Sequence, residues 1–316
     1  MKKYLAITGG VGGAKLALGL TKILSESEVA FLVNTGDDFE HMGLSISPDL
    51  DTLMYTLSGL SNAEVGWGRD GETWRCLDAY KKLGGESWFS LGDEDLAVHF
   101  RRTELLKEGR SLSEVTTDLF RCLGVHYPCW PMSDESVRTH IETEVGRLEF
   151  QHYFVRDRCD HEVQSIHFVS STVAHPLDSL VRYLRDPDLC GIVICPSNPF
   201  LSIDPILSVH GLREALMASN APIIAVSPLI GGQAIKGPTA KIMNELGLVL
   251  SPVSVAMHYV DLITGFILDD TDTEHAQAIQ ELGLSVVTTQ TLMNSLDDRI
   301  NLAQTAVKLC DKLRGQ

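Results

Sequence analysis

Short apolar runs alternate with an amphipathic stretch near the start of the chain. Residues 4–8 and 29–33 are apolar runs of strand length, and between them Leu16, Leu20, Ile23 and Leu24 recur on one helix face. A strand–helix–strand unit of this kind predicts two parallel strands, because the crossover helix returns the chain to the same end of the sheet.

The same alternation returns in the C-terminal half. Strand-like runs occupy residues 191–195, 222–227, 248–251, 263–268 and 284–288, and helical patterns occupy 204–218, 238–246, 273–282 and 295–313. We therefore expect one Rossmann-like α/β domain over residues 1–316, built on a parallel sheet with helices on both faces.

The pattern changes between the two halves. Residues 49–60, 72–83, 93–108 and 111–123 have mainly helical spacing. Residues 137–169 alternate apolar and polar side chains, through Phe150, His152 and Phe154, as in an antiparallel meander with a turn at Gly146. The sheet is thus expected to be split in sequence by a mainly helical insertion at about 60–135 and a small antiparallel β extension at about 136–170.

Composition and charge restrict the class of protein. Hydrophobic residues make up 44% and charged residues 22% of the 316, which is typical of a globular chain. The formal charge of −16 argues against nucleic-acid and anionic-membrane partners, which need basic patches. No apolar stretch approaches the ~18 residues that cross a bilayer, and the seven cysteines form no C-x-x-C pair. We expect a cytoplasmic protein with reduced thiols and no membrane partner.

A glycine-rich turn follows the first predicted strand. Glycines at 9, 10, 12 and 13, followed by Lys15, can bring backbone N–H groups and a helix N-terminus close to a phosphate. The turn matches both the dinucleotide fingerprint and the P-loop only in part. A tight strand-to-helix turn without a ligand is the alternative, but ligands favour this edge of a parallel sheet, so phosphate binding is the preferred interpretation.

Four aspartates follow the second strand: Asp37, Asp38, Asp49 and Asp51. Asp49 and Asp51 fall in the first turn of a predicted helix, where acids are favoured whatever the function. Four carboxylates this close can instead hold Mg²⁺, which takes one or two carboxylates together with phosphate oxygens.

Three further loops are candidate sites. Residues 196–199 follow one strand, and the loop from Ser227 to Gly237, with Lys236 near its end, is a plausible anion cradle at a helix start. The third stretch, 91–96, opens a helix with His99, Arg101 and Arg102, and its spacing alone favours an acidic helix start with solvated arginines. No nucleophile motif is present, which is compatible with phosphoryl transfer because that reaction depends on positioning and electrostatics.

Taken together and in order, these segments resemble the 2-phospho-L-lactate transferase (CofD) family of deazaflavin coenzyme F-420 biosynthesis. The resemblance runs from about residue 4 to beyond residue 290 and is based on TGGVGGAK at 8–15, VNTGDD at 33–38, PDLDT at 48–52, LGD at 91–93 with His99, PMSD at 131–134, PSNP at 196–199 and SPLIGG at 227–232.

The resemblance implies a Mg²⁺-dependent, dimeric enzyme. Such enzymes transfer a phospholactyl group, or a related phosphoenolpyruvyl or phosphoglyceryl group, from a guanosine diphosphate-linked three-carbon acid to the hydroxyl of the deazaflavin FO, and GMP leaves. Asp49 and Asp51 are the implied catalytic residues, and Asp37, Asp38, Asp49 and Asp51 the implied metal ligands. The implied substrate contacts are Gly9, Gly10, Gly12, Gly13, Lys15, Asn34, Ser90, Asp93, Ser197, Asn198, Ser227, Gly231, Lys236 and Gly237.

One segment departs from the family pattern, and two other functions stay open. The family often has basic residues where this chain has Ser90 and Glu94, which puts the acceptor contact there in doubt and points to a different activated acid. A CofD-like regulator of the YvcK type that binds nucleotide sugars is one alternative. An NAD(P)-dependent dehydrogenase, with Asp37 or Asp38 on the cofactor ribose, is the other.

Overall fold

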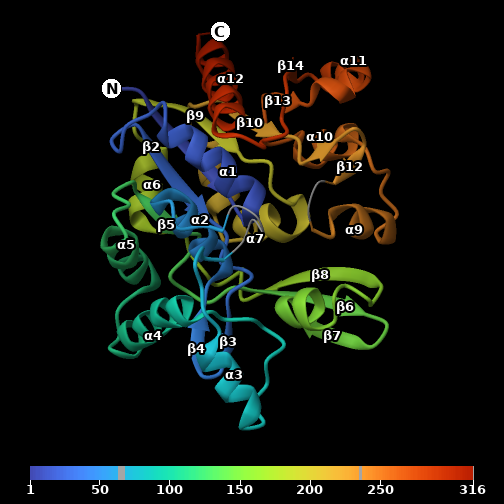
Figure 1. Ribbon diagram of the computed structural model, residues 1–316. Helices are drawn as coiled ribbons and strands as arrows, with labels where there is room; N and C mark the ends of the chain where they lie inside the picture. Colours follow the sequence, from blue (N-terminus) through green and yellow to red (C-terminus); the bar gives the residue numbers. More distant parts are fainter. Residues whose placement is uncertain (63–67, 235–236, 316) are drawn as a thin grey trace.

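A seven-stranded parallel sheet forms the centre of the computed structural model, which describes residues 1–62, 68–234 and 237–315 (Figure 1). The strand order is β14-β13-β10-β9-β1-β2-β5, and every pair in it is parallel. The bounds are β1 Lys3–Thr8, β2 Val29–Val33, β5 Cys129–Pro131, β9 Leu189–Ile194, β10 Ile223–Val226, β13 Gly265–Leu268 and β14 Ser285–Thr288. The predicted Rossmann-like α/β fold is confirmed.

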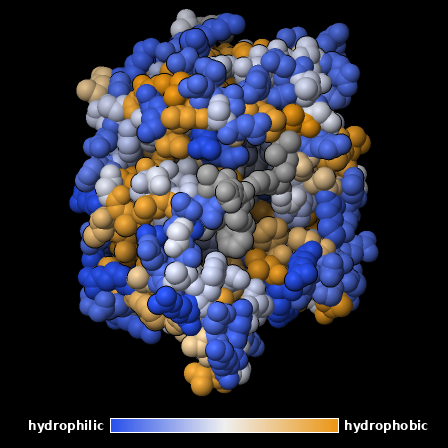
Figure 2. Space-filling model, in the orientation of Figure 1, coloured by the Kyte–Doolittle hydropathy of each residue, from blue (hydrophilic) through white to orange (hydrophobic). Residues whose placement is uncertain are grey.

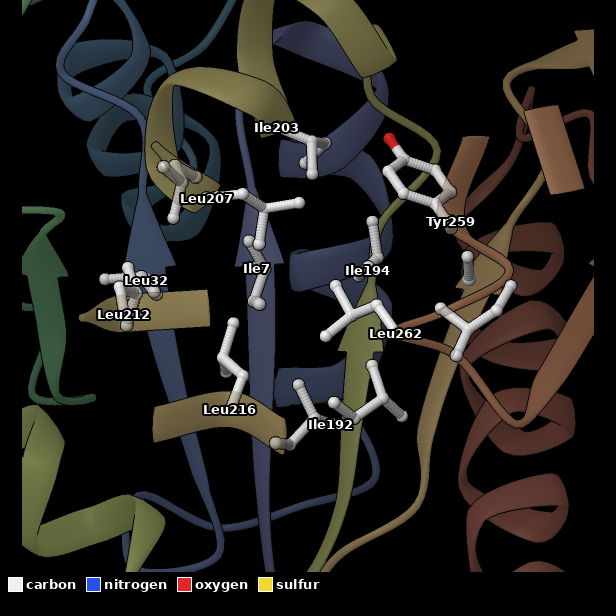
Figure 3. Close-up of a cluster of buried hydrophobic side chains, with 14 of the residues drawn as sticks. Ile7, Leu32, Ile192, Ile194, Ile203, Leu207, Leu212, Leu216, Tyr259 and Leu262 are labelled. Carbon is white, nitrogen blue, oxygen red and sulfur yellow. The ribbon is translucent and has the colours of Figure 1, made fainter. Parts of the chain in front are cut away.

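Helices cover both faces of the sheet because successive strand residues point to opposite sides. Tyr4 and Ala6 of β1 pack under α1 (Gly10–Thr21) and α12 (Leu296–Arg314), whereas Leu5 and Ile7 pack under α6 (Asp178–Leu184), α8 (Leu212–Met217) and α10 (Pro252–Tyr259). Figure 3 shows part of this second layer, with side chains from both the sheet and the helices: Ile7, Ile192, Ile194, Leu207, Leu212 and Leu216. Burial on both faces explains why the strands are continuous apolar runs.

The central part of the chain is helical as expected, but it also contains strands that the pattern did not predict. Its helices are α2 (Pro48–Ser58), α3 (Arg75–Lys82), α4 (Asp93–Lys107) and α5 (Leu112–Cys122). A hairpin of β3 (Phe39–His41) and β4 (Leu44–Ile46) turns at Met42 and Gly43, both with positive φ, and β5 adds an edge strand to the main sheet beside β2. Strands of three residues are too short for a period-2 signal.

The predicted meander is confirmed, but it is shorter than expected. β6 (Arg138–Thr143), β7 (Gly146–Glu149) and β8 (Val163–Val169) form an antiparallel sheet in the order β7-β6-β8. The alternation does not continue as a strand past Glu149, because a π-helical turn, η1 (His152–Arg156), follows and buries Tyr153. In Figure 1 this small sheet stands apart from the main one.

Three predictions for the C-terminal half were wrong in detail. Residues 248–251 are not a strand; they lead into α10, whose Ser251 side chain accepts a hydrogen bond from the Ser254 backbone N–H. The expected helix 204–218 is interrupted at Gly211, which has φ 78°, and forms α7 (Asp204–Leu207) and α8. The expected helix 273–282 is a 3₁₀ turn, η3 (Asp270–His275), followed by α11 (Ala276–Gln280).

The remaining elements connect these parts. They are η2 (Pro199–Ile203), α9 (Thr239–Glu245), β11 (Leu229–Ile230) and β12 (Gln233–Ala234). Across the described residues, none of the helices has both the length and the apolar character that a membrane span requires.

Close contact between α1 and α12 gives a prediction for Gly19. A Cβ at this position would overlap the backbone carbonyl of Arg299 on α12. Gly→Ala in a helix normally stabilises by up to ~1 kcal/mol, but here we expect Gly19→Ala to lower the free energy of unfolding by about 1–3 kcal/mol, because the two helices must separate. Chemical denaturation measures this, and Asn301→Ala on the exposed face of α12 is the control. A Gly19→Ala protein as stable as the parent would contradict the proposed contact.

Candidate active site

A cavity of about 1110 Å³ opens at the carboxyl ends of the parallel strands. It lies next to β1, at the point where the chain order of the sheet reverses, with β2 on one side and β9 on the other. Ligands of open α/β sheets bind at such a switch point. Figure 2 shows a hollow near the middle of one face of the molecule, with hydrophobic side chains beside it.

The glycine-rich turn lies at the cavity, although it is shorter than expected. The helix begins at Gly10, and Gly9, Gly10 and Gly12 line the cavity. Gly13 does not line it, because it packs against Thr8 and Ser197. The Ser197 hydroxyl accepts from the Gly9 N–H at 3.2 Å and donates to its carbonyl at 2.8 Å, which joins the ends of β1 and β9.

The carboxylate of Asp49 contacts the N-terminus of α1. It lies in the first turn of α2, and its carboxylate accepts hydrogen bonds from the Gly10 N–H at 2.8 Å and from Asn34 Nδ2 at 2.9 Å. Burial raises the pKa of Asp49 to about 6, although the hydrogen bonds from Asn34 and Gly10 lower it. Asn34 does not line the cavity; it holds Asp49 from behind and accepts from the Gly36 N–H at 2.8 Å.

Asp37 lies beside Asp49 and also lines the cavity. Burial and the neighbouring charge of Asp49 raise the pKa of Asp37 well above its usual range. Its Oδ1 atom is buried and has no hydrogen-bond partner among the described residues. Such an oxygen is costly to bury alone, so it is suited to a cation or a proton brought by a ligand.

Asp38 points away from the cavity. It accepts a hydrogen bond of 2.7 Å from the Ser47 hydroxyl, and it does not line the cavity wall. Burial raises its pKa to about 7, against the attraction of Arg138.

Asp51 forms a buried ion pair with Arg102 of α4. Both side chains are almost fully buried, and two guanidinium nitrogens contact the two carboxylate oxygens, one of them at 3.1 Å. Arg102 also lies 3.1 Å from His99 Nδ1, and His99 Nε2 lies 3.2 Å from Asp95, which accepts from the Tyr55 hydroxyl at 2.5 Å. The pair thus connects α2 to the insertion.

The expectation of solvated arginines on α4 was wrong for Arg102. Arg101 is exposed beside Glu104, but Arg102 points inward. Asp95, His99 and Arg102 recur at the i, i+4, i+7 spacing of one helix face, and this polar stripe was the available signal.

Two of the four aspartates fit a divalent cation. Among the described residues, no three His, Cys, Asp or Glu side chains are grouped as a metal site. Asp37, Asp49 and Asp51 line the cavity, but Asp51 is neutralised by Arg102, and Asp38 lies outside. Mg²⁺ needs only one or two protein carboxylates when a substrate supplies phosphate oxygens, so the pair matches this mode of binding.

The other predicted contacts fall into three groups. Lys15, Ser90, Ser197, Asn198, Ser227 and Gly237 line the cavity. Gly231 does not line it, because its N–H and that of Gly232 bind the buried carboxylate of Asp272 at 2.9 and 3.0 Å. Asp93 does not line it either, because it accepts hydrogen bonds from the first N–H groups of α3. Lys236 lies outside the described residues.

Aromatic side chains form a second wall of the cavity, which the sequence analysis missed. The insertion contributes Trp74, Trp88 and Phe89, and the segment after β7 contributes Phe150 and Phe154. The ring centroids of Trp88 and His152 are 4.9 Å apart, so the insertion and the β extension meet at this wall. The apolar pair 88–89 in a loop was the signal, because exposed loops rarely carry two adjacent large rings.

Comparison with known proteins gives consistent results. The sequence model of the family described as "2-phospho-L-lactate transferase CofD" matches residues 5–303. A phosphoenolpyruvate transferase of Kitasatospora aureofaciens is 36% identical over 99% of both chains. A 2-phospho-L-lactate transferase of Methanocaldococcus jannaschii is 34% identical over 97% of this chain and 98% of its own.

A solved structure supports the fold. A member of the UPF0052 family from Bacillus halodurans superposes with a TM-score of 0.63 over 97% of this chain and 99% of its own, at 14% identity. An identity this low concerns the fold alone.

The raised pKa of Asp38 predicts a pH-dependent stability. The folded protein keeps the proton up to about pH 7, whereas the unfolded chain releases it near 3.8, so this group makes folding less favourable as pH rises between these values. From pH 6 to pH 8 its contribution falls by about 1 kcal/mol. We therefore expect the free energy of unfolding of Asp38→Asn to rise by about that amount relative to the parent between pH 6 and pH 8. Denaturant unfolding in the presence of a metal chelator measures this. Asp78→Asn, at an exposed position of α3, is the control; parallel pH curves for Asp38→Asn and the parent would contradict the shift.

The Asp51–Arg102 pair predicts strong coupling between two residues. Asp51→Asn leaves a buried guanidinium unpaired, and we expect it to cost about 3–5 kcal/mol of unfolding free energy. Arg102→Gln leaves the carboxylate unpaired, and the double variant should be more stable than the sum of the two losses implies. A thermodynamic cycle by denaturant unfolding measures the coupling, with Arg101→Gln as the neighbouring exposed control. Additive losses would show that the pair is not formed.

Proposed function

We propose a specific transfer reaction for this chain, which belongs to the 2-phospho-L-lactate transferase CofD family and is a transferase of the coenzyme F-420 pathway. A phospholactyl group, or a related phosphoenolpyruvyl or phosphoglyceryl group, passes from a guanosine diphosphate-linked donor to the deazaflavin alcohol FO. The FO hydroxyl oxygen forms a bond to the phosphorus bearing the acid, the bond from that phosphorus to GMP breaks, and the hydroxyl proton leaves.

The single observation that supports this proposal is a cavity with two different walls. One wall carries the buried carboxylates and the start of α1, and the other carries the aromatic rings of the insertion and the β extension. A phosphate-bearing donor suits the first wall and a planar deazaflavin suits the second. A volume of about 1110 Å³ exceeds the usual upper range for one small ligand, ~1,000 Å³, so two substrates can meet inside it.

On this proposal the donor diphosphate lies at the glycine-rich turn. Gly12 and Lys15 belong to the first turns of α1, where free N–H groups and the helix dipole favour an anion. Ser197 and Asn198 border the same space from the end of β9. Because the Gly10 N–H is held by Asp49, a phosphate would bind beside that carboxylate instead of displacing it.

We assign to Asp37 and Asp49 the binding of Mg²⁺ and the acceptance of the FO hydroxyl proton. These two carboxylates would hold Mg²⁺, which would supply positive charge against that of the donor phosphates. A raised pKa suits a carboxylate that must accept the hydroxyl proton near neutral pH, and both residues have one. The resemblance implies a catalytic and metal-binding role for Asp51, which also lines the cavity; we instead assign it the anchoring of the insertion, because it is paired with Arg102.

The two alternative functions receive no comparable support. Relatives matching nearly the full chain are named transferases, which favours transfer over a nucleotide-sugar-binding regulator and over a dehydrogenase. The dimer stays a prediction from the resemblance, and the cytoplasmic location stays a prediction from the composition and the cysteines.

Turnover with defined donors tests the proposal. Purified protein with Mg²⁺ and FO should release GMP from at least one guanosine diphosphate-linked acid among phospholactate, phosphoenolpyruvate and phosphoglycerate types, measured by chromatography. Asp49→Asn should lower kcat by about 10²–10⁴, because the Asn34 and Gly10 contacts can persist while the charge is lost. Asp78→Asn is the control, since it changes an exposed carboxylate that does not line the cavity. Absence of GMP release with all three donors would refute the reaction.

A further inference from the structure

Arg158 lines the cavity, and its guanidinium is not paired with any described residue. Of the basic side chains in the described part of the cavity wall, Lys15 donates to the Met293 carbonyl at 3.1 Å and Arg69 pairs with Glu94. Arg158 has no hydrogen bond or ion pair to any described residue. The cavity wall is otherwise rich in carboxylates, so a free guanidinium there is available to an anionic ligand.

The backbone holds Arg158 in an unfavourable conformation. Arg158 and Cys159 have φ values of 52° and 59°, in the left-handed region that favours glycine. They follow η1, and the turn is closed by hydrogen bonds from the Asp157 N–H to the His152 carbonyl at 2.8 Å and from the Cys159 N–H to the Tyr153 carbonyl at 2.9 Å. Helices that end in this way usually place glycine at the left-handed position. Strained residues of this kind cluster at ligand sites, where the side chain is needed.

The same segment begins next to the reacting carboxylates. Gln151 donates from Nε2 to the Asp37 carbonyl at 3.4 Å, and Phe154 and Val155 line the cavity between Gln151 and Arg158. Arg158 therefore borders the same cavity as Asp37 and Asp49. Its long side chain can approach a three-carbon acid attached to the reacting phosphorus from this part of the wall.

We infer that Arg158 binds the carboxylate of the three-carbon acid that is transferred. The inference depends on the proposed function, because it presupposes a donor and a product that carry this acid. The phospholactyl, phosphoenolpyruvyl and phosphoglyceryl groups all carry a carboxylate beside the ester oxygen, and a guanidinium pairs with a carboxylate through two parallel hydrogen bonds. Arg158 therefore recognises the feature that these acids share, while the diphosphate is held at the other wall.

Three deazaflavin ligands separate the carboxylate from the phosphate and the ring. The probes are FO, the phosphate monoester of FO, and the product in which that phosphate carries the three-carbon acid, each titrated by deazaflavin fluorescence. Arg158→Gln should weaken product binding about 10- to 30-fold and change the affinities for FO and its phosphate ester less than two-fold. Arg158→Lys should recover part of the loss, because it restores the charge without the bidentate geometry.

Two further variants separate binding from structure. Arg158→Gly should lose product affinity as Arg158→Gln does, yet keep or raise the melting temperature, because glycine tolerates the positive φ. Arg156→Gln changes an arginine that pairs with Asp157 and does not line the cavity, and it should leave all three affinities unchanged.

The outcomes that overturn the inference are distinct. Equal losses for the product and the phosphate ester would assign Arg158 to the phosphate, and equal losses for all three ligands would assign it to the ring. Unchanged product affinity would leave Arg158 a solvated side chain. A parent protein that binds neither FO nor the product would refute the proposed function itself.

Discussion

The burial of four carboxylates at one edge of the sheet is the constraint on which the site depends. Each ionised aspartate needs a hydrogen-bond donor or a cation beside it, because burying an uncompensated charge costs several kcal/mol of folding free energy. Asp49 accepts hydrogen bonds from the first N–H of α1 and from the amide of Asn34. Asp38 accepts one from the Ser47 hydroxyl, and Asp51 forms an ion pair with Arg102. These contacts fix α1, α2 and α4 relative to the ends of β1 and β2. They leave Asp37 and Asp38 each with one buried oxygen that has no described donor, and of these two residues Asp37 lines the cavity.

The same contacts position parts of the chain that are far apart in sequence. Arg102 holds the insertion against α2, and Gln151 holds the β extension against the Asp37 loop. The Tyr55–Asp95 hydrogen bond supports the first of these contacts, and the hydrogen bond of 2.8 Å from the Thr139 N–H to the Gly36 carbonyl supports the second. Because the aromatic wall is built from these two parts, the contacts hold it in place relative to the carboxylates. Substitutions at Asp51 therefore act on the fold and on the site together, and loss of activity there does not by itself identify a catalytic group.

The sequence predicted the sheet because its strands are buried on both faces and read as continuous apolar runs, and it predicted the site loops because they follow those strands. It missed β3, β4 and β5, whose three residues carry no periodicity, and it extended the meander through Phe150 and Phe154, whose alternation belongs to a π-helical turn. Arg102 was missed for another reason. The polar stripe on its helix face was a local signal, but the partner that pairs with Arg102, Asp51, lies on a different element and cannot be identified from the stripe.

A net charge of −16 is unfavourable for binding a phosphate ligand, and the site shows where the difficulty lies. Asp37 and Asp49 repel a diphosphate unless a cation neutralises them, so on the proposed reaction the donor and Mg²⁺ each raise the affinity for the other. That neutralisation is confined to the wall where the two carboxylates lie. The carboxylate of the transferred acid projects beyond it, towards a cavity lined by aromatic rings and further acids. An anion placed there needs a positive group of the protein's own, which gives a strained and unpaired arginine at that position a physical reason to be kept.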